Sequence, residues 1–233
     1  MPKVLIITGD AAESLEVMYP YQRLIEEGYE VDIAAQQVKK LQFVVHDFVD
    51  GFDTYTEKLG YTWDADVAFA DVDPNDYVAL VIPGGRAPEY IRNDADAQRI
   101  ARHFMTGDLP VAQLCHGPLI TAAAGALDGR RTAAYPALEP DIKAAGAEFV
   151  NAGAVIDGQM VSGRAWPGAR RCGIPTSRWT PLTSPRPGWP RRAARWEWSR
   201  STCRVRAGWR SYWTRPAPRW RSGRPAATSA PPW

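Results

Sequence analysis

The sequence predicts an α/β sandwich with a mostly parallel central sheet, and two features of the chain carry this prediction. Short apolar runs such as Lys3 to Thr8 (KVLIIT) are continuous rather than alternating, which is typical of strands covered on both faces. Segments with helical spacing of apolar residues lie between these runs, and strands that alternate with helices form parallel sheets with helices on their faces.

The first elements form one strand–helix–strand unit with a right-handed crossover. After the opening strand, Ser14 to Glu27 has helical periodicity, and Gly28 ends the helix. Glu30 to Ala35 (EVDIAA) is the second strand. The helical residues predicted to face the core are Leu15, Met18, Leu24 and Ile25.

The same alternation continues in the second half of the chain. A strand from Val78 to Ile82 leads into Pro83-Gly84-Gly85, and another buried strand runs from Val111 to Leu114. The remaining predicted elements are helices over Asp94 to Met105, about His116 to Ala126 and Pro140 to Ala145, and weaker strands around Thr132, Glu148 and Met160.

Between Gln36 and Asp71 the alternation of strands and helices is lost. The stretch VVHDFVDGFDTY has aromatic and β-branched residues around Asp50-Gly51, which predicts an antiparallel hairpin. We interpret residues 36–71 as an insertion that covers a pocket or meets a partner subunit.

Charge divides the chain near Pro167. Residues 1–167 hold 13 Lys and Arg against 25 Asp and Glu, a net charge of −12. Residues 168–233 hold 15 Arg against the single acid Glu197, a net charge of +14, so the whole chain carries +2. This second part also holds eight of the ten Trp and ten of the 20 Pro, without helical or strand periodicity. The sequence therefore predicts a folded domain over 1–167 and an irregular, disordered tail over 168–233.

Two interpretations of this tail are open. An arm rich in Arg and Trp is suited to nucleic acid, because guanidinium groups bind phosphates and indoles stack on bases. Alternatively, a segment of Arg, Pro, Ala, Gly, Trp, Ser and Thr without Lys, Asn or Phe is what GC-rich DNA encodes out of frame. We favour the frameshift and expect no specific nucleic-acid partner, because basic tails usually mix Lys with Arg.

The N-terminus has the pattern of a strand rather than a signal peptide, and no apolar stretch approaches the roughly 20 residues of a membrane span. Cys115, Cys172 and Cys203 have unrelated spacings, which fit neither a disulfide framework nor a metal site. We therefore expect a soluble cytoplasmic protein with no metal and no other cofactor.

Cys115 stands where the strand VAQL turns into a helix, which is the arrangement of a nucleophile elbow, and Gly117 follows two residues on, where a side chain would crowd the turn. The helix N-terminus and His116 favour a partly ionised thiol near neutral pH. Gly84 and Gly85 follow the neighbouring strand and leave N–H groups open to a substrate oxygen. Glu13, just past the first strand, supplies a carboxyl near the thiol.

Each of these residues also has a purely structural interpretation. A lone cysteine at a strand end is most often a small packed hydrophobe, and Gly-Gly after a strand is often a plain turn. Glu13 would then be an exposed acid that complements the helix dipole. All three features nevertheless meet at the carboxyl edge of one sheet, where parallel α/β sheets form their sites, and together they favour a nucleophile.

Several colinear segments resemble the PfpI/ThiJ superfamily, and specifically the PfpI-like intracellular proteases. They include KVLIITGDAAESLEVMYPYQRLIEEGYEVDIAA, ALVIPGGRAPEYIRND, VAQLCHGPLITAAAGALDGRR and VIDGQMVSGRAWP. The resemblance covers essentially Met1 to Pro167, apart from the longer stretch 36–71.

This resemblance implies a flavodoxin-like three-layer sandwich with Cys115 as nucleophile, His116 as base and Glu13 as a buried carboxyl beside the thiol. It implies a homo-oligomer, dimer or hexamer, in which Glu89 of a neighbouring subunit completes the triad. The N–H groups of Gly85 and His116 would form the oxyanion hole. Members act as intracellular peptidases or amidases on peptides, or as cofactor-free glyoxalases or deglycases on small carbonyl substrates such as 2-oxoaldehydes.

The chain departs from the family after Pro167, where the tail replaces the family's last amphipathic helix. Loss of that helix is expected to reduce stability and impair activity, because aliphatic side chains lose their cover. A function of another class is also open, namely a non-enzymatic redox-sensing stress protein or chaperone that uses oxidation of Cys115. His116 beside Cys115 favours the enzyme, because a sensor needs no base.

Overall fold

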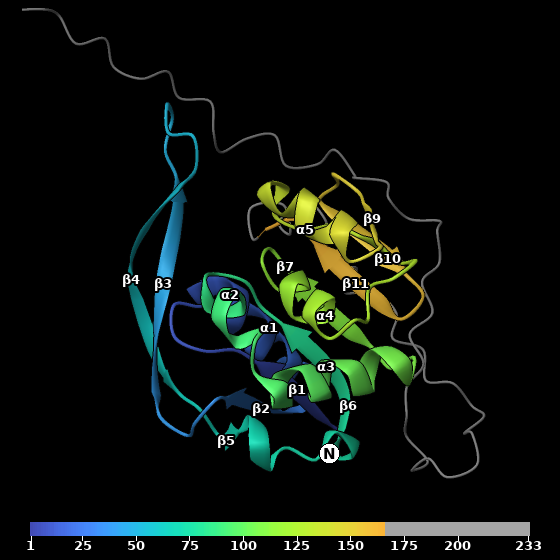
Figure 1. Ribbon diagram of the computed structural model, residues 1–233. Coiled ribbons are helices and arrows are strands. Elements are labelled where there is room, and N and C mark those ends of the chain that lie inside the picture. The colour runs from blue at the N-terminus through green and yellow to red at the C-terminus, as the bar shows by residue number, and fades with distance from the viewer. Residues whose placement is uncertain (166–233) are drawn as a thin grey trace, which may run out of the picture. The chain divides into compact units, whose positions relative to one another are not determined.

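The computed structural model describes residues 1–165, which form the predicted α/β sandwich (Figure 1). The predicted tail over 168–233, with both of its interpretations, lies outside the described residues. A seven-stranded sheet has the order β10-β11-β7-β6-β1-β2-β5. Its strand pairs are parallel except for β10 with β11. The prediction of a mostly parallel central sheet is confirmed.

The bounds of the elements follow the sequence pattern closely. The strands of the central sheet are β1 (Lys3–Ile7), β2 (Glu30–Ala35), β5 (Val67–Ala68), β6 (Tyr77–Ile82), β7 (Val111–Leu114), β10 (Ala154–Asp157) and β11 (Met160–Gly163). Two smaller sheets pair β3 (Lys40–Phe48) with β4 (Tyr55–Asp64), and β8 (Arg131–Thr132) with β9 (Glu148–Phe149). The helices are α1 (Ser14–Glu26), α2 (Ala87–Ile91), α3 (Ala95–Thr106), α4 (Pro118–Ala123) and α5 (Glu139–Ala144), with 3-10 turns at Phe69–Asp71, Pro74–Asp76 and Pro136–Leu138.

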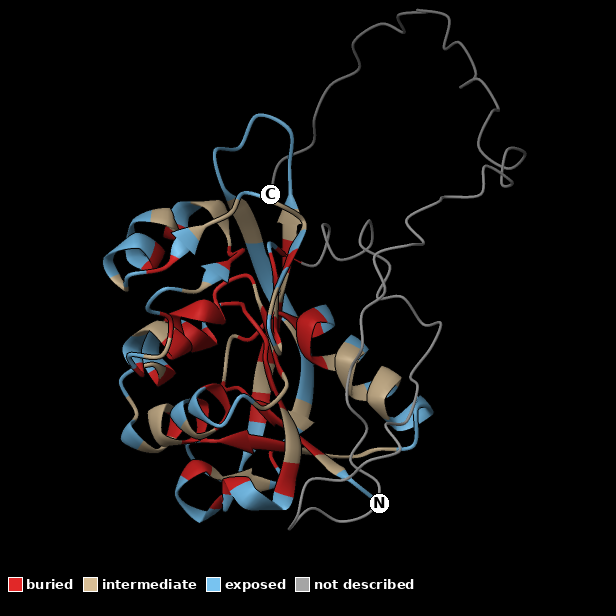
Figure 2. Ribbon diagram, turned by 90° about the vertical axis from the view of Figure 1, so that its right-hand side faces the viewer, coloured by how far each residue is buried: buried red, intermediate tan, exposed pale blue. Residues whose placement is uncertain are grey.

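Strand β1 shows why the apolar runs are continuous. Leu5 is fully buried in a core shared with α3 and α4, and Ile6 is fully buried in a second core shared with α1 and β3. Successive side chains of a strand point to opposite faces, so both faces must be covered. Figure 2 shows the buried residues concentrated along the sheet, with helices on both sides of it. Each such side chain contributes about 1.5–3 kcal/mol.

Two predictions about the helices are wrong. Leu15 and Ile25 of α1 were expected to face the core, but they are 41% and 45% exposed. The helix is turned so that Glu16 and Val17 are buried, with the Glu16 carboxyl directed at the end of a neighbouring strand. The helix expected from about His116 to Ala126 is shorter, since α4 is confined to Pro118–Ala123.

The predicted hairpin is confirmed, because β3 and β4 pair antiparallel on either side of a turn that contains Asp50-Gly51. It stands beside the central sheet rather than within it (Figure 1). Backbone hydrogen bonds attach its base to the loop after β1: Ala11 N–H donates to Gln42 at 2.8 Å, and Val44 N–H donates to Ala12 at 2.9 Å. Within residues 1–165, no helix is both long and apolar enough to cross a membrane.

Candidate active site

Cys115 forms a strained turn between β7 and α4. Its φ of 54° lies in the left-handed region, which costs a non-glycine residue on the order of 1–3 kcal/mol. Two backbone hydrogen bonds hold the turn: Cys115 N–H donates to Gly163 at 3.0 Å, and Tyr135 N–H donates to Cys115 at 2.9 Å. The residue is only 4% exposed. This geometry is that of the predicted nucleophile elbow.

Glycine is required at two positions around this turn because other atoms approach too closely for a side chain. A Cβ on Gly84 would lie 2.5 Å from Cys115 Cβ and 2.6 Å from Glu16 Oε2. A Cβ on Gly117 would collide with the carbonyl oxygen of Ile82. The glycines that the sequence pattern singled out therefore let the turn pack against the neighbouring strand end.

His116 is placed to exchange a proton with the thiol. Its Nδ1 lies 3.2 Å from Cys115 Sγ, and the residue is 5% exposed. Burial lowers the pKa of His116 to about 4, so the imidazole is neutral at pH 7. A neutral imidazole can accept a proton, which is what a general base must do.

Glu89 on α2 reaches the other side of the same imidazole. Its Oε1 lies 3.8 Å from His116 Nε2, and the two residues belong to one chain. Because His116 is neutral at pH 7, this contact is not an ion pair at that pH. The family resemblance assigns this role to a Glu of a neighbouring subunit, whereas here Glu89 approaches His116 within its own chain.

The expectation of a partly ionised thiol is contradicted by the surroundings of Cys115. Burial raises the pKa of the Cys115 thiol well above its ordinary value, and the nearby Glu16 carboxylate raises it further. The N–H groups of Gly85 and His116 face the sulfur and act in the opposite direction. Desolvation therefore outweighs the effect of the helix N-terminus, and these surroundings favour the protonated thiol.

Two buried carboxyls lie at this end of α1, and only Glu13 is expected there from the sequence. Glu13, 1% exposed, caps α1: its Oε2 accepts a hydrogen bond from Glu16 N–H at 2.9 Å. Burial raises the pKa of Glu13, and N–H groups of the first turn oppose that rise. Glu16, also 1% exposed, accepts a hydrogen bond from Gly84 N–H at 2.8 Å and raises the Cys115 pKa more than Glu13 does.

Glu16 was missed because an acid in the first turn of an amphipathic helix is normally exposed to solvent. The available signal was its spacing from Glu13. An acid at an N-cap accepts a hydrogen bond from the N–H group two or three residues later, so a buried Glu13 would have placed the backbone of Glu16 next to it. Among residues 1–165, no group of three or more His, Cys, Asp and Glu side chains is arranged to hold a metal ion.

Aromatic rings complete the site, although no sequence pattern assigns them a role there. Tyr135 stacks on His116, with ring centroids 5.1 Å apart and an interplanar angle of 21°. Tyr55, from β4 of the hairpin, packs edge-on against His116 at 6.2 Å and against Tyr135 at 5.5 Å. The β3–β4 hairpin therefore contributes to the surroundings of Cys115.

Comparison with known proteins agrees with this geometry. The model of the DJ-1/PfpI family matches residues 2–172. A deglycase of Thermococcus kodakarensis is 43% identical over 162 residues, which cover 70% of this chain and 89% of that protein. Deglycase PfpI of Pyrococcus furiosus is 41% identical with the same coverage. With such relatives, the protein is an enzyme of the DJ-1/PfpI type.

Solved structures share the fold. A ThiJ/PfpI domain protein from Brachyspira murdochii superposes with a TM-score of 0.62 at 20% identity, covering 73% of this chain and 90% of that one. DJ-1β of Drosophila melanogaster superposes with a TM-score of 0.61 at 20% identity, covering 73% of this chain and 85% of that one. The predicted flavodoxin-like sandwich and the predicted family are both confirmed, and the chain belongs to the DJ-1/PfpI family.

Proposed function

We propose that the protein is a cofactor-free enzyme that uses Cys115 to convert 2-oxoaldehydes, or their adducts, to 2-hydroxy acids. One observation carries the proposal: Cys115 Sγ lies 3.2 Å from Nδ1 of a neutral, buried His116. Two N–H groups, of Gly85 and His116, face the same sulfur. Relatives with 41% and 43% identity are named deglycases, which supports carbonyl chemistry of this kind.

The first step is addition of sulfur to the aldehyde carbon. His116 Nδ1 takes the thiol proton while the S–C bond forms and the C=O π bond breaks, and the same proton then passes to the aldehyde oxygen, which becomes the hydroxyl of a hemithioacetal. Charge that develops on this oxygen is stabilised by backbone N–H groups next to the sulfur. The raised pKa of the thiol makes a base at this distance necessary, because little thiolate exists beforehand.

The second step is a proton shift between the two substrate carbons. A base removes the hydrogen from the former aldehyde carbon, and a proton is returned to the former ketone carbon, which leaves a 2-hydroxy thioester on Cys115. Water then cleaves the thioester and releases the 2-hydroxy acid and the thiol. The net change is addition of one water molecule, so no external oxidant or reductant is needed.

Burial of the sulfur favours small substrates over peptides. A peptide bond would have to reach a residue that is 4% exposed, whereas a three-carbon aldehyde needs far less room. A neutral imidazole beside the thiol favours catalysis over redox sensing, because oxidation requires no base. We also propose a homo-oligomer, as the family resemblance implies, in which Glu89 acts on His116 of its own chain; light scattering would measure its size.

The test compares the wild-type enzyme with Cys115→Ala and with Cys172→Ala, the same change at another cysteine. Each protein is incubated with methylglyoxal and, separately, with a peptide amide. We expect lactate from methylglyoxal with wild type and Cys172→Ala, and none with Cys115→Ala. Equal lactate formation by wild type and Cys115→Ala would refute the proposal, and peptide cleavage without lactate would favour the peptidase.

A further inference from the structure

The β3–β4 hairpin carries a tyrosine into the site. Tyr55 begins β4, outside the central sheet, yet its ring packs against His116 and Tyr135, the two aromatic residues beside Cys115. We name these three rings, Tyr55, His116 and Tyr135, the aromatic cap. The Tyr55 ring also stacks on His46 of β3, with centroids 4.1 Å apart and planes at 25°. Tyr55 is therefore held between the hairpin and the site.

The phenol of Tyr55 lies within electrostatic reach of the reacting groups. Burial raises the pKa of Tyr55 to about 12, and negative charge at Cys115 and at Glu89 acts in the same direction. The hydroxyl is consequently neutral at pH 7. An uncharged ring against His116 adds bulk beside the thiol without adding a charge to it.

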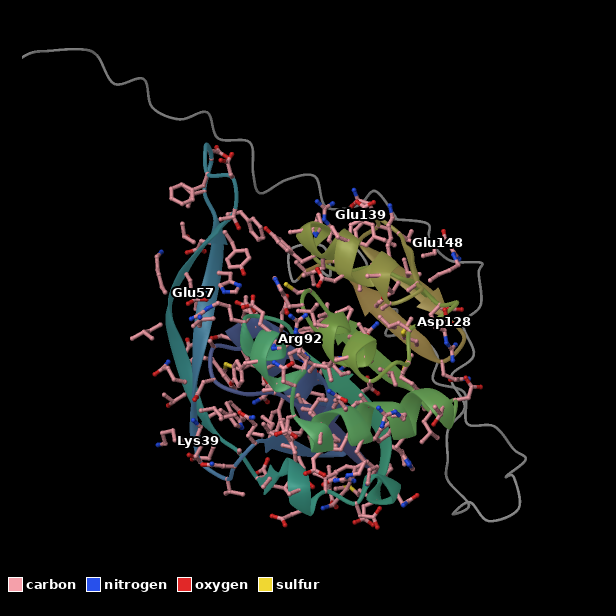
Figure 3. The ribbon with its side chains drawn as sticks, viewed as in Figure 1. Lys39, Glu57, Arg92, Asp128, Glu139 and Glu148 are labelled. Carbon is pink, nitrogen blue, oxygen red and sulfur yellow. The ribbon has the colours of Figure 1, made fainter. Side chains whose placement is uncertain are left out.

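A set of polar contacts fixes the hairpin where Tyr55 meets the site. Glu57 lies two residues after Tyr55 on β4, on the same face of the strand, and part-way along the hairpin (Figure 3). It binds Arg86 through two short hydrogen bonds, 2.7 Å to Nη2 and 2.8 Å to Nε. It also lies 3.0 Å from Nε2 of His46, which is 3% exposed.

These contacts join the hairpin to the loop that faces the sulfur. Arg86 directly follows Gly85, whose N–H faces Cys115. A second link is made by Thr54, whose Oγ1 lies 3.3 Å from the hydroxyl of Tyr135. The position of the Tyr55 ring is therefore determined by the hairpin's own contacts with the site, and not by pairing with the central sheet.

We propose that Tyr55 is a specificity-determining residue whose ring limits the size of the carbonyl compounds that reach Cys115. This inference rests on the proposed function, since it concerns the substrates of that reaction. Three features support this inference together. The thiol is buried, and the Tyr55 ring packs on His116, the proposed base for that thiol. The polar contacts of Glu57 with Arg86 and His46 hold the hairpin, and with it the ring, in this position. Small 2-oxoaldehydes are accepted, and those with a bulky substituent are excluded.

The test compares methylglyoxal with phenylglyoxal, which carries a ring in place of the methyl group. The variants are Tyr55→Ala, which removes the ring, Tyr55→Phe, which keeps it, and Phe48→Ala. Phe48 is the matched control, because its ring also contacts Tyr55, at 6.5 Å, but it is 54% exposed. We expect Tyr55→Ala to raise the ratio of kcat/KM for phenylglyoxal to that for methylglyoxal by about tenfold or more, and the other two to leave it within about twofold.

A second measurement does not depend on turnover. Alkylation of Cys115 by iodoacetamide and by the bulkier N-benzylmaleimide is followed by mass spectrometry of the Cys115 peptide, since the chain holds two other cysteines. Tyr55→Ala should accelerate the maleimide reaction more than the iodoacetamide reaction. If the wild-type enzyme converts no 2-oxoaldehyde, the proposed function fails, while the alkylation ratio still tests the role of Tyr55.

Glu57→Gln keeps the Tyr55 ring and weakens the polar contacts of residue 57 with Arg86 and His46. Its size preference should relax in the same direction as that of Tyr55→Ala, by a smaller factor. Circular dichroism checks that each variant is folded. An unchanged alkylation ratio in folded Tyr55→Ala, or an equal relaxation in Tyr55→Phe, would overturn the inference.

Discussion

Nδ1 of His116 lies 3.2 Å from Sγ of Cys115, although the two residues are adjacent in the chain. Neighbouring side chains normally diverge, on a strand to opposite faces and on a helix by about a quarter turn. The left-handed backbone of Cys115, with φ of 54°, departs from both regular geometries and forms the elbow. One turn thus brings together the thiol and the imidazole, which are the proposed nucleophile and base.

Replacing the base should reduce turnover without unfolding the protein. We expect His116→Gln to lower kcat for methylglyoxal by about 10²- to 10⁴-fold, the usual contribution of a positioned general base. His103→Gln, the same change on α3, is the control and should retain wild-type activity. Steady-state kinetics on both variants makes the comparison, and a His116→Gln enzyme of normal kcat would remove His116 from the reaction.

The buried imidazole should also make stability depend on pH. The pKa of His116 is about 4 in the folded protein, below its ordinary value of 6.5. Between these pH values the unfolded chain binds more protons, so the free energy of unfolding falls as pH falls from 6.5 to 4, by up to about 3 kcal/mol. Urea unfolding at several pH values should show that the free energy of unfolding depends less steeply on pH in His116→Gln than in the wild type. An equal pH dependence in the two proteins would contradict this.

The Cys115 thiol of the free protein should ionise at a higher pH than an ordinary cysteine. We expect the rate of Cys115 alkylation by iodoacetamide to rise with a midpoint above the ordinary value of about 8.5, because burial and Glu16 raise its pKa. Glu16→Gln removes a negative charge and should move the midpoint to lower pH. Glu26→Gln, at an exposed position of the same helix, should leave it unchanged. A midpoint near neutrality in the wild type would be evidence against this electrostatic balance.

A methyl group at Gly84 should disrupt the site. The added Cβ would lie 2.9 Å from the backbone nitrogen of His116, besides its close approach to Cys115 and Glu16. We expect Gly84→Ala to cost about 1–3 kcal/mol of stability and most of the activity, because the elbow must shift to admit it. Thermal unfolding and steady-state kinetics measure the two effects. A fully active and equally stable Gly84→Ala variant would show that the elbow can shift at little cost in free energy.

The composition change after Pro167 predicts a feature of the coding DNA. The neighbouring reading frame from about codon 167 should encode an amphipathic stretch of about 15 to 20 residues, the length of one helix that covers a sheet face. Sequencing the gene and translating all three frames decides this. If the other frames encode no such stretch, the frameshift proposal is abandoned in favour of the basic arm.

Much of the fold was predictable because it depends on local patterns. The apolar run of β1 and the N-cap Asp94, whose side chain accepts hydrogen bonds from Asp96 and Ala97 N–H, can be recognised from a few neighbouring residues. Which face of α1 is buried could not be predicted in this way. Leu15 is exposed because the burial of Glu16 against Gly84 sets the rotation of the helix, and that contact is long-range.

The same distinction applies to the site. Cys115 and Gly117 are identified by the turn that joins a strand to a helix, which is local chemistry. The part played by Tyr55 depends on how far β4 extends and on which face of the hairpin meets His116. Neither is encoded in a short window of sequence, because both follow from packing between distant segments.

The separate sheet of β3 and β4 has a consequence for engineering. These strands pair with each other, and the hairpin joins the rest of residues 1–165 through its base at Ala12 and Glu13 and through side chains. Because Leu41 and Phe43 of β3 are fully buried in the core, only the turn end of the hairpin is open to exchange, and such an exchange would leave the strand pairing of the central sheet as it is. Under the proposed function, we expect such exchanges to change which aldehydes reach Cys115 while the Cys115–His116 turn stays as it is.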